Sequence, residues 1–330
     1  MENKKASIIY ILNILKEETD ESHFLKQAEI AKKVNEKYGI SIERKAISRS
    51  LTLLEELGYD INKNKNSGYA LFAREFDESE IQYLADAIFS SKSISGNEAQ
   101  KLCDSLSNTL SKYKRKDFSY LNKNVDINRT PSRDVFYNIN IISEAIKKKK
   151  EISFEYLRYD ENGKLHNARD NWRMKGISPY YLVNNFGRYY LLGNYFRYEN
   201  LTCLRVEFLS NIEIMDFDAK PKAEVLGKNF SISNYINDHV YIFGSEVVNA
   251  VIKIYDDRII NDLFDWFGKN VKITTKDNVK IATIKADEQA FFYWCLQYGH
   301  DLEVLSPDSL RKKVTEELSH MLERYLPKKE

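Results

Sequence analysis

Four polar side chains share one face of the third helix that the sequence predicts, residues 41–57. They lie at positions i, i+3, i+4 and i+7: Lys45, Ser48, Arg49 and Thr52. Cationic and hydroxyl side chains of this kind bind DNA bases and phosphates. The acidic pair Glu55-Glu56 falls in the second half of the helix, where it would not repel phosphate. The pattern is typical of a helix that enters a major groove by its N-terminal half.

Further cations surround this helix. Arg44 begins it, and a polar loop after it carries Lys63 and Lys65, so we expect these three to contact phosphate or the minor groove. Residues 1–75 contain 13 basic and 12 acidic residues, so the hypothesis depends on where the charges lie. A solvated charged face is the alternative for the helix alone. The preceding helices, the short turn and the basic loop favour DNA binding.

A second group of candidates lies in three predicted strands between residues 176 and 216. Arg205 stands between Leu204 and Val206, and a charge in an apolar strand is costly to bury unless it is paired. It either lines a binding pocket or forms a salt bridge to Glu207 or Glu155. Tyr190 either lines the same pocket or packs in the core. Tyr189 and Leu191, on the opposite face, are predicted to be structural.

Other positions support this pocket more weakly. Tyr156, Lys175 and Ser178 are candidates by their place in the predicted strands. The histidines are scattered without metal-ligand spacing, and there is no glycine-rich phosphate loop, nucleophile elbow or paired carboxylate motif. Three distant cysteines disfavour a disulfide framework or a cysteine zinc site. We therefore predict no metal, no cofactor and no enzymatic activity.

The elements that must position these residues predict a multidomain α+β protein. Helices at 6–18, 26–37 and 41–57 and two short strands around a lysine-bearing loop have the order of a winged helix-turn-helix. Four domains are predicted: a winged helix at 1–75, a helical connector at 76–134, a small Sm/SH3-like β-barrel with its leading helix at 135–220, and a ferredoxin-like α+β domain of β-α-β-β-α-β order at 221–330.

Composition places the chain among soluble globular proteins. It has 330 residues, of which 43% are hydrophobic and 30% charged, and its net charge is +1. No apolar run approaches the roughly 18–20 residues needed to cross a bilayer, and the first residues have no signal-peptide core. A cytoplasmic protein without membrane contact is expected.

The chain resembles the bacterial WYL-domain transcriptional regulators over essentially its whole length. Residues 41–61 are similar to their winged-helix segment, residues 177–182 and 187–193 to the block that names the domain, and residues 267–307 to the C-terminal extension domain. Tyr189 stands where the family usually has Trp. Phe208 replaces the second arginine of an arginine-x-acid-arginine arrangement that begins at Arg205, and it could offer a stacking surface.

The resemblance implies a homodimeric regulator that binds double-stranded DNA. It also implies that the barrel senses a small-molecule or nucleic-acid effector, often a nucleotide, through its basic residues, and that the C-terminal domain helps to dimerise. The alternative is a nucleic-acid-sensing or RNA-binding adaptor without sequence-specific duplex binding. An enzyme that acts on a nucleotide is the second alternative.

Overall fold

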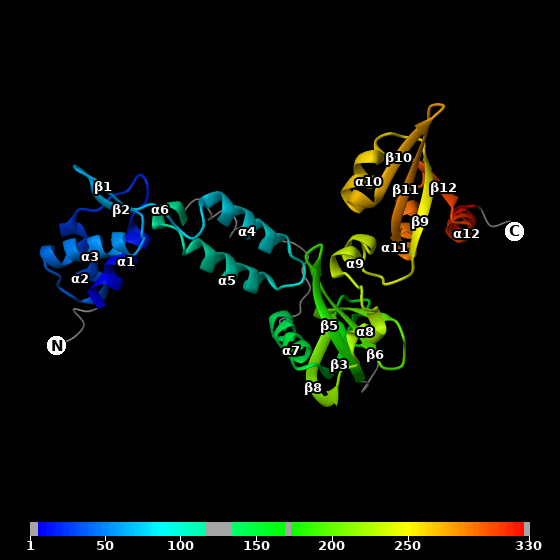
Figure 1. The fold of residues 1–330 in the computed structure, drawn as a ribbon, viewed down its shortest axis with the longest axis horizontal. Helices are drawn as coiled ribbons and strands as arrows, with labels where there is room; N and C mark the ends of the chain where they lie inside the picture. Colours follow the sequence, from blue (N-terminus) through cyan, green and yellow to red (C-terminus); the bar gives the residue numbers. More distant parts are fainter. Residues whose placement is uncertain (1–5, 116–133, 169–172, 327–330) are drawn as a thin grey trace. The chain divides into compact units, whose positions relative to one another are not determined.

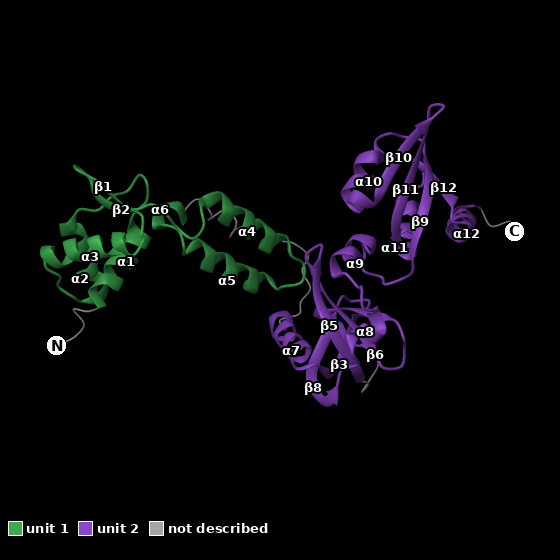
Figure 2. Ribbon diagram, in the orientation of Figure 1, with its two compact units in different colours: residues 1–131 green, residues 132–330 purple. Residues whose placement is uncertain are grey.

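The computed structural model describes residues 6–115, 134–168 and 173–326. The chain divides into two compact units, Met1–Pro131 and Ser132–Glu330 (Figure 2). Unit 1 is mainly helical, whereas unit 2 contains two larger sheets with helices against them (Figure 1). The strand pairs within the described ranges are antiparallel. The protein is therefore a mixed α and β multidomain chain.

Unit 1 begins with three helices that share one apolar core. Their bounds are α1 Ser7–Glu18, α2 Gln27–Tyr38 and α3 Arg44–Glu56. Apolar residues at helical spacing meet at the centre, where Ile11, Ile30 and Ile47 are fully buried. The N-cap of α3 is Glu43, so the prediction that Ser41 begins this helix is wrong. Ile42 packs against the core from the extended segment before the helix.

A short hairpin follows α3 and is fastened to the segment before α2. Its strands are β1 Ile61–Asn64 and β2 Gly68–Leu71. The side-chain oxygen of Asn64 accepts hydrogen bonds from the backbone N–H groups of Asn66 and Ser67, which shapes the turn. Leu25 and Tyr69 exchange two backbone hydrogen bonds of 2.9 Å. Three helices and a hairpin thus follow the order that the sequence predicts.

The helical connector pairs two longer helices. Its elements are α4 Glu78–Ser90, α5 Gly96–Ser107 and α6 Lys112–Arg115. Asp77 caps α4, because its carboxylate accepts a hydrogen bond from the backbone N–H of Glu80 while the Glu80 side chain accepts one from the backbone N–H of Asp77. A small apolar cluster that includes Ile81 and Cys103 joins α4 to α5. Residues 116–133 of the predicted connector lie outside the described residues.

The first sheet of unit 2 is covered by a helix. The elements are α7 Val135–Lys148, β3 Lys150–Tyr159, β4 Leu165–Asn167, β5 Met174–Asn185, β6 Arg188–Tyr195, β7 Leu201–Arg205, the 3-10 turn η3 Val206–Phe208 and β8 Leu209–Asp218. The strand order is β4-β3-β5-β6-β7, and β8 also pairs with β3. Ile142 of α7 packs with Phe154, Ile177 and Leu191 in the core beneath the helix.

Two details of this sheet matter for the site. Phe186 and Gly187, with φ of 47° and 73°, form the two-residue turn between β5 and β6. The predicted strand 201–208 ends at Arg205, because the chain enters η3 and turns into β8. The strands predicted to form a small Sm/SH3-like β-barrel form an antiparallel sheet that does not close into a barrel within the described residues.

The second sheet of unit 2 follows residues 217–244, which the sequence predicts to be irregular. That segment instead contains α8 Lys222–Leu226 and α9 Ile232–Asp238. The domain beyond it comprises β9 Val247–Ile254, α10 Ile259–Phe267, the 3-10 turn η4 Gly268–Asn270, β10 Val271–Lys276, β11 Val279–Asp287, α11 Glu288–Gln297, β12 Leu302–Ser306 and α12 Asp308–Tyr325. The sheet order is β10-β11-β9-β12.

The elements of this domain follow the predicted β-α-β-β-α-β order, with α12 added at the end. Phe291 and Trp294 of α11 are fully buried in its core, where they pack as structural aromatics. None of the helices in the described part of the chain is long and apolar enough to cross a membrane.

Gly68 offers a test of how the hairpin is held. Its φ is +114°, and a Cβ there would lie 2.2 Å from the carbonyl oxygen of Leu25. Gly58 has a φ of +90° with open space around a Cβ, so Gly58→Ala is the matched control. We expect Gly68→Ala to cost about 1–3 kcal/mol more than the control. Hydrogen exchange at the Leu25 and Tyr69 amides measures this difference, and equal protection in both variants would contradict the clash.

Candidate nucleic-acid interface and effector cavity

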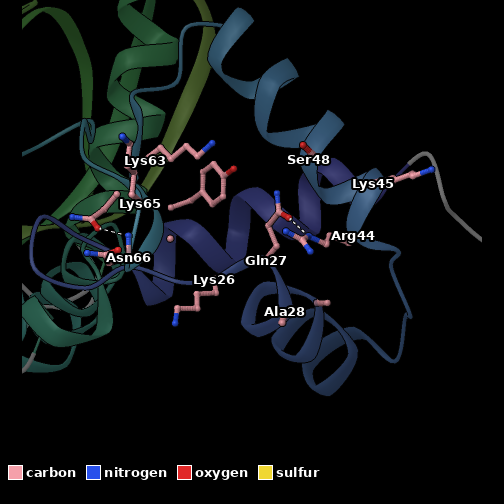
Figure 3. Close-up of a pocket in the computed structure, with 13 residues that line it drawn as sticks. Lys26, Gln27, Ala28, Arg44, Lys45, Ser48, Lys63, Lys65 and Asn66 are labelled. Carbon is pink, nitrogen blue, oxygen red and sulfur yellow. Dashed lines mark hydrogen bonds between the residues drawn. The ribbon is translucent and has the colours of Figure 1, made fainter.

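A groove of about 830 Å³ lies in unit 1 between the starts of two helices and the hairpin (Figure 3). Its lining residues carry five cationic side chains and no acidic one. The full lining is Lys26, Gln27, Ala28, Ala31, Arg44, Lys45, Ser48, Lys63, Asn64, Lys65, Asn66, Gly68 and Tyr69. A surface with one sign of charge and no carboxylate attracts a polyanion.

The local folding positions these cations on opposite sides of the groove. Arg44 donates from Nε to the side-chain oxygen of Gln27 at 3.0 Å, which ties the first turn of α3 to that of α2 (Figure 3). On the hairpin side, the ammonium of Lys63 lies 5.6 Å from the ring centroid of Tyr69. The N-cap Glu43 makes no side-chain capping bond, so the first N–H groups of α3 add their partial positive charge.

The groove brings together most of the predicted DNA-binding residues. Five of them line it: Arg44, Lys45, Ser48, Lys63 and Lys65. Arg49 and Thr52 lie on the same exposed face of α3 but are not part of the groove lining.

Sequence reasoning missed the contribution of α2. Lys26, Gln27 and Tyr69 line the groove as well, and they come from segments that the sequence treats as scaffold. The available signal was Lys26 at the start of the predicted helix 26–37, where a cation lies beside the first N–H groups of the helix. Tyr69 gave no such signal, because its place follows from the pairing of β2 with Leu25.

A second cavity, of about 500 Å³, lies in unit 2 against the first sheet. The sheet contributes one wall, and the segment 240–243 together with α10 contributes the other. The lining is Tyr156, Asn185, Phe186, Arg188, Tyr190, Cys203, Arg205, Val240, Tyr241, Ile242, Phe243 and Trp266. The composition of this lining is typical of a small-molecule site, since such sites are concave, largely apolar and hold few polar groups.

A buried carboxylate fixes the two arginines of this cavity. Glu207 is 0% exposed, and its Oε1 accepts from Nε and Nη2 of Arg205 at 2.9 and 2.6 Å. Arg188 donates from Nη1 to the same oxygen at 3.0 Å. The sequence left open whether Arg205 lines a pocket or forms a salt bridge, and in the structure it does both. Its partner is Glu207, while Glu155 lies near Arg173 instead.

The aromatic candidates divide between the cavity and its support. Tyr156 and Tyr190 line the cavity, and burial raises the pKa of both phenols while nearby Arg205 opposes the shift. Phe208 does not line it. The ring of Phe208 lies 4.2 Å from the Arg205 guanidinium and meets the edges of Tyr156 and Tyr159. Its stacking surface therefore serves Arg205 rather than an incoming ligand.

The remaining candidates lie elsewhere in unit 2. Ser178 is buried and accepts a hydrogen bond from the backbone N–H of Lys220, and Lys175 is exposed outside the cavity. Sequence reasoning missed Arg188 and the aromatic wall of Tyr241, Phe243 and Trp266. The sequence Gly187-Arg188 at a predicted turn could have marked Arg188 as a candidate. The aromatic wall could not be found in this way, because it depends on contacts between segments that are distant in sequence. No group of three or more His, Cys, Asp or Glu suited to a metal occurs among the described residues.

Comparison with solved structures finds, among others, two chains of low sequence identity. Proteasome accessory factor B/C (PafBC) of Arthrobacter aurescens is 14% identical with a TM-score of 0.30, over 98% of this chain and 49% of that one. A CRISPR Cas-related protein is 14% identical with a TM-score of 0.40, over 97% and 84%. This chain thus spans about half the length of the first. Both scores are too low to establish a shared overall fold. Comparison with curated proteins gives no match.

Two family models match within unit 2. The WYL domain model matches residues 137–214, which include most of α7, most of the first sheet and both cavity arginines. The WCX domain model matches residues 246–322, which include the second sheet and most of α12. The chain therefore contains a WYL domain followed by a WCX domain.

Proposed function

We propose that the protein is a DNA-binding transcription regulator whose winged-helix head in unit 1 binds duplex DNA. The observation that carries the proposal is the groove, in which five cations from three segments face one space whose lining contains no acidic residue. The N-terminus of α3, which has no acidic residue in its first turn, adds to the positive potential. The exposed face of α3 continues beyond the groove through Arg49 and Thr52. That face would lie in the major groove while the hairpin follows the backbone.

The roles of the cations follow from where they lie. Lys63 and Lys65 stand on the hairpin, as a wing that contacts phosphates would require. Arg44 is held by Gln27, which suits a fixed phosphate contact at the start of α3. Lys45, Ser48, Arg49 and Thr52 are free to face base edges, and Arg49 can bind guanine with two hydrogen bonds.

The second part of the proposal concerns regulation. The cavity in the WYL domain would bind an effector, and the effector would shift operator affinity by its differential affinity for the conformations of the protein. The wall formed by residues 240–243 and Trp266 supports this, because a ligand there would contact both the WYL sheet and α10 of the WCX domain. We further propose a cytoplasmic homodimer that binds a two-fold operator, with the C-terminal domain as dimer contact.

The hairpin lysines give a direct test of duplex binding. We expect Lys63→Gln/Lys65→Gln to weaken operator and unrelated duplex equally and to lower the log–log salt slope by about 2, since each lost phosphate contact removes about 0.9. Fluorescence anisotropy of full-length protein at several salt concentrations measures both effects. Lys32→Gln/Lys101→Gln, which makes the same charge change outside the groove, is the control. Salt-insensitive binding by the wild-type protein would favour the adaptor alternative.

Arg49 tests sequence reading. We expect Arg49→Ala to cost about 1–3 kcal/mol on an operator selected from a random duplex library, because a bidentate contact to a base is lost. Binding to unrelated duplex should change little. Arg258→Ala, on an exposed side chain of unit 2, is the control. An equal loss of affinity for every duplex sequence would indicate that Arg49 contacts phosphate. Wild-type affinity of the Arg49→Ala variant would show that Arg49 is not part of the interface.

A further inference from the structure

We propose that the cavity in unit 2 selects a small planar aromatic acid with a single negative charge. The inference rests on the proposed effector role of this cavity and names the ligand class. The charged side chains that line the cavity are Arg188 and Arg205, and the rest of its lining is mainly aromatic and aliphatic.

The size and the walls favour a flat ligand. A volume of about 500 Å³ suits a small molecule rather than a folded partner. Three rings form a continuous wall, since Trp266 lies 5.3 Å from Phe186 and 5.4 Å from Tyr241 between ring centroids. Phe186 remains 67% exposed and Phe243 51% exposed. Large apolar rings left open at the rim of a cavity gain stability when a planar ligand covers them.

The charge balance favours a monoanion. Both guanidiniums already share Oε1 of Glu207, so this group of three side chains carries one net positive charge. A carboxylate ligand would neutralise it. A phosphate monoester carries about −1.5 to −2 near pH 7, which would leave excess negative charge beside a buried carboxylate. The internal Glu207 therefore acts against more highly charged ligands.

The arginines are already held in place for such a ligand. The Arg205 guanidinium lies between the Glu207 carboxylate and the Phe208 ring, and the two cations are each 28% exposed at the side chain. Hydrogen bonds among the described residues use Nε and Nη2 of Arg205 and Nη1 of Arg188. A guanidinium has five N–H donors, so each retains donors for a carboxylate. Fixed donors reduce the ordering cost of binding.

The test compares three ligands that share one ring system and differ in charge. Naphthoate, neutral naphthamide and dianionic naphthyl phosphate are titrated into full-length protein by calorimetry, together with a short single-stranded oligonucleotide. We expect naphthoate to bind most tightly and naphthamide about tenfold more weakly, because charge-assisted hydrogen bonds are lost. Equal binding of naphthamide, or tighter binding of naphthyl phosphate or the oligonucleotide, would overturn the proposal.

Variants test the part played by Glu207. We expect Glu207→Gln to reverse the preference in favour of naphthyl phosphate, because the amide keeps an acceptor for the arginines and removes the competing charge. Arg205→Gln should weaken naphthoate binding about tenfold or more, and Arg258→Gln, outside the cavity, should leave it unchanged. An unchanged preference in folded Glu207→Gln protein would contradict the charge argument.

Two controls keep the outcomes separate. Circular dichroism and thermal melting report folding, and if Glu207→Gln does not fold, the wild-type series with Arg205→Gln and Arg188→Gln decides the ligand class. Duplex binding is measured in parallel on the wild-type protein. Intact DNA binding with the wrong ligand order would reject only this inference, whereas absent DNA binding would reject the proposed function.

Discussion

The buried carboxylate of Glu207 is the constraint on which the cavity of the WYL domain depends. A carboxylate that is 0% exposed persists in charged form only with partners, and removing one partner from such a pair typically costs roughly 3–5 kcal/mol. Here the partners come from β6 and β7, while Glu207 itself lies in η3. The ion group therefore joins two strands to the turn that follows them. The same contacts aim both guanidiniums along the wall of the cavity.

The groove of unit 1 is built on the opposite principle. Its cations are exposed, and the one that is held, Arg44, is held by the neutral side chain of Gln27 rather than by a carboxylate. Charge that is not neutralised locally remains available to a polyanion, and its effect falls with salt. In unit 2 the carboxylate of Glu207 offsets one of the two positive charges of Arg188 and Arg205. The chain thus carries an exposed positive groove in unit 1 and a cavity in unit 2 whose positive charge is partly compensated by its own carboxylate.

Local patterns predicted most elements, and long-range contacts account for the errors. The spacing of apolar residues was enough to predict α1 to α3 and the elements of the domain after residue 246, because each of them buries one regular face. The end of β7 at Arg205 was missed, since it depends on Glu207 turning inward to two arginines. α9 was missed because its burial comes from contacts such as that of Tyr235 with Cys203, which are distant in sequence. The aromatic wall of the cavity could not be predicted for the same reason. The exposure of Lys63 and Lys65 could be predicted, because side chains of a hairpin loop are usually exposed to solvent.

The head of unit 1 is joined to its connector by buried polar contacts rather than by a loose linker. Asp20, only 2% exposed, accepts hydrogen bonds from the hydroxyl of Ser111 at 2.6 Å and from His23. His23 also stacks on Tyr113 with ring centroids 3.5 Å apart. Arg74 donates to backbone oxygens of both Thr19 and Thr109. Buried polar groups that satisfy one another resist separate movement, because each would lose its partner. These contacts therefore resist a displacement of the connector relative to the three helices and the hairpin within unit 1.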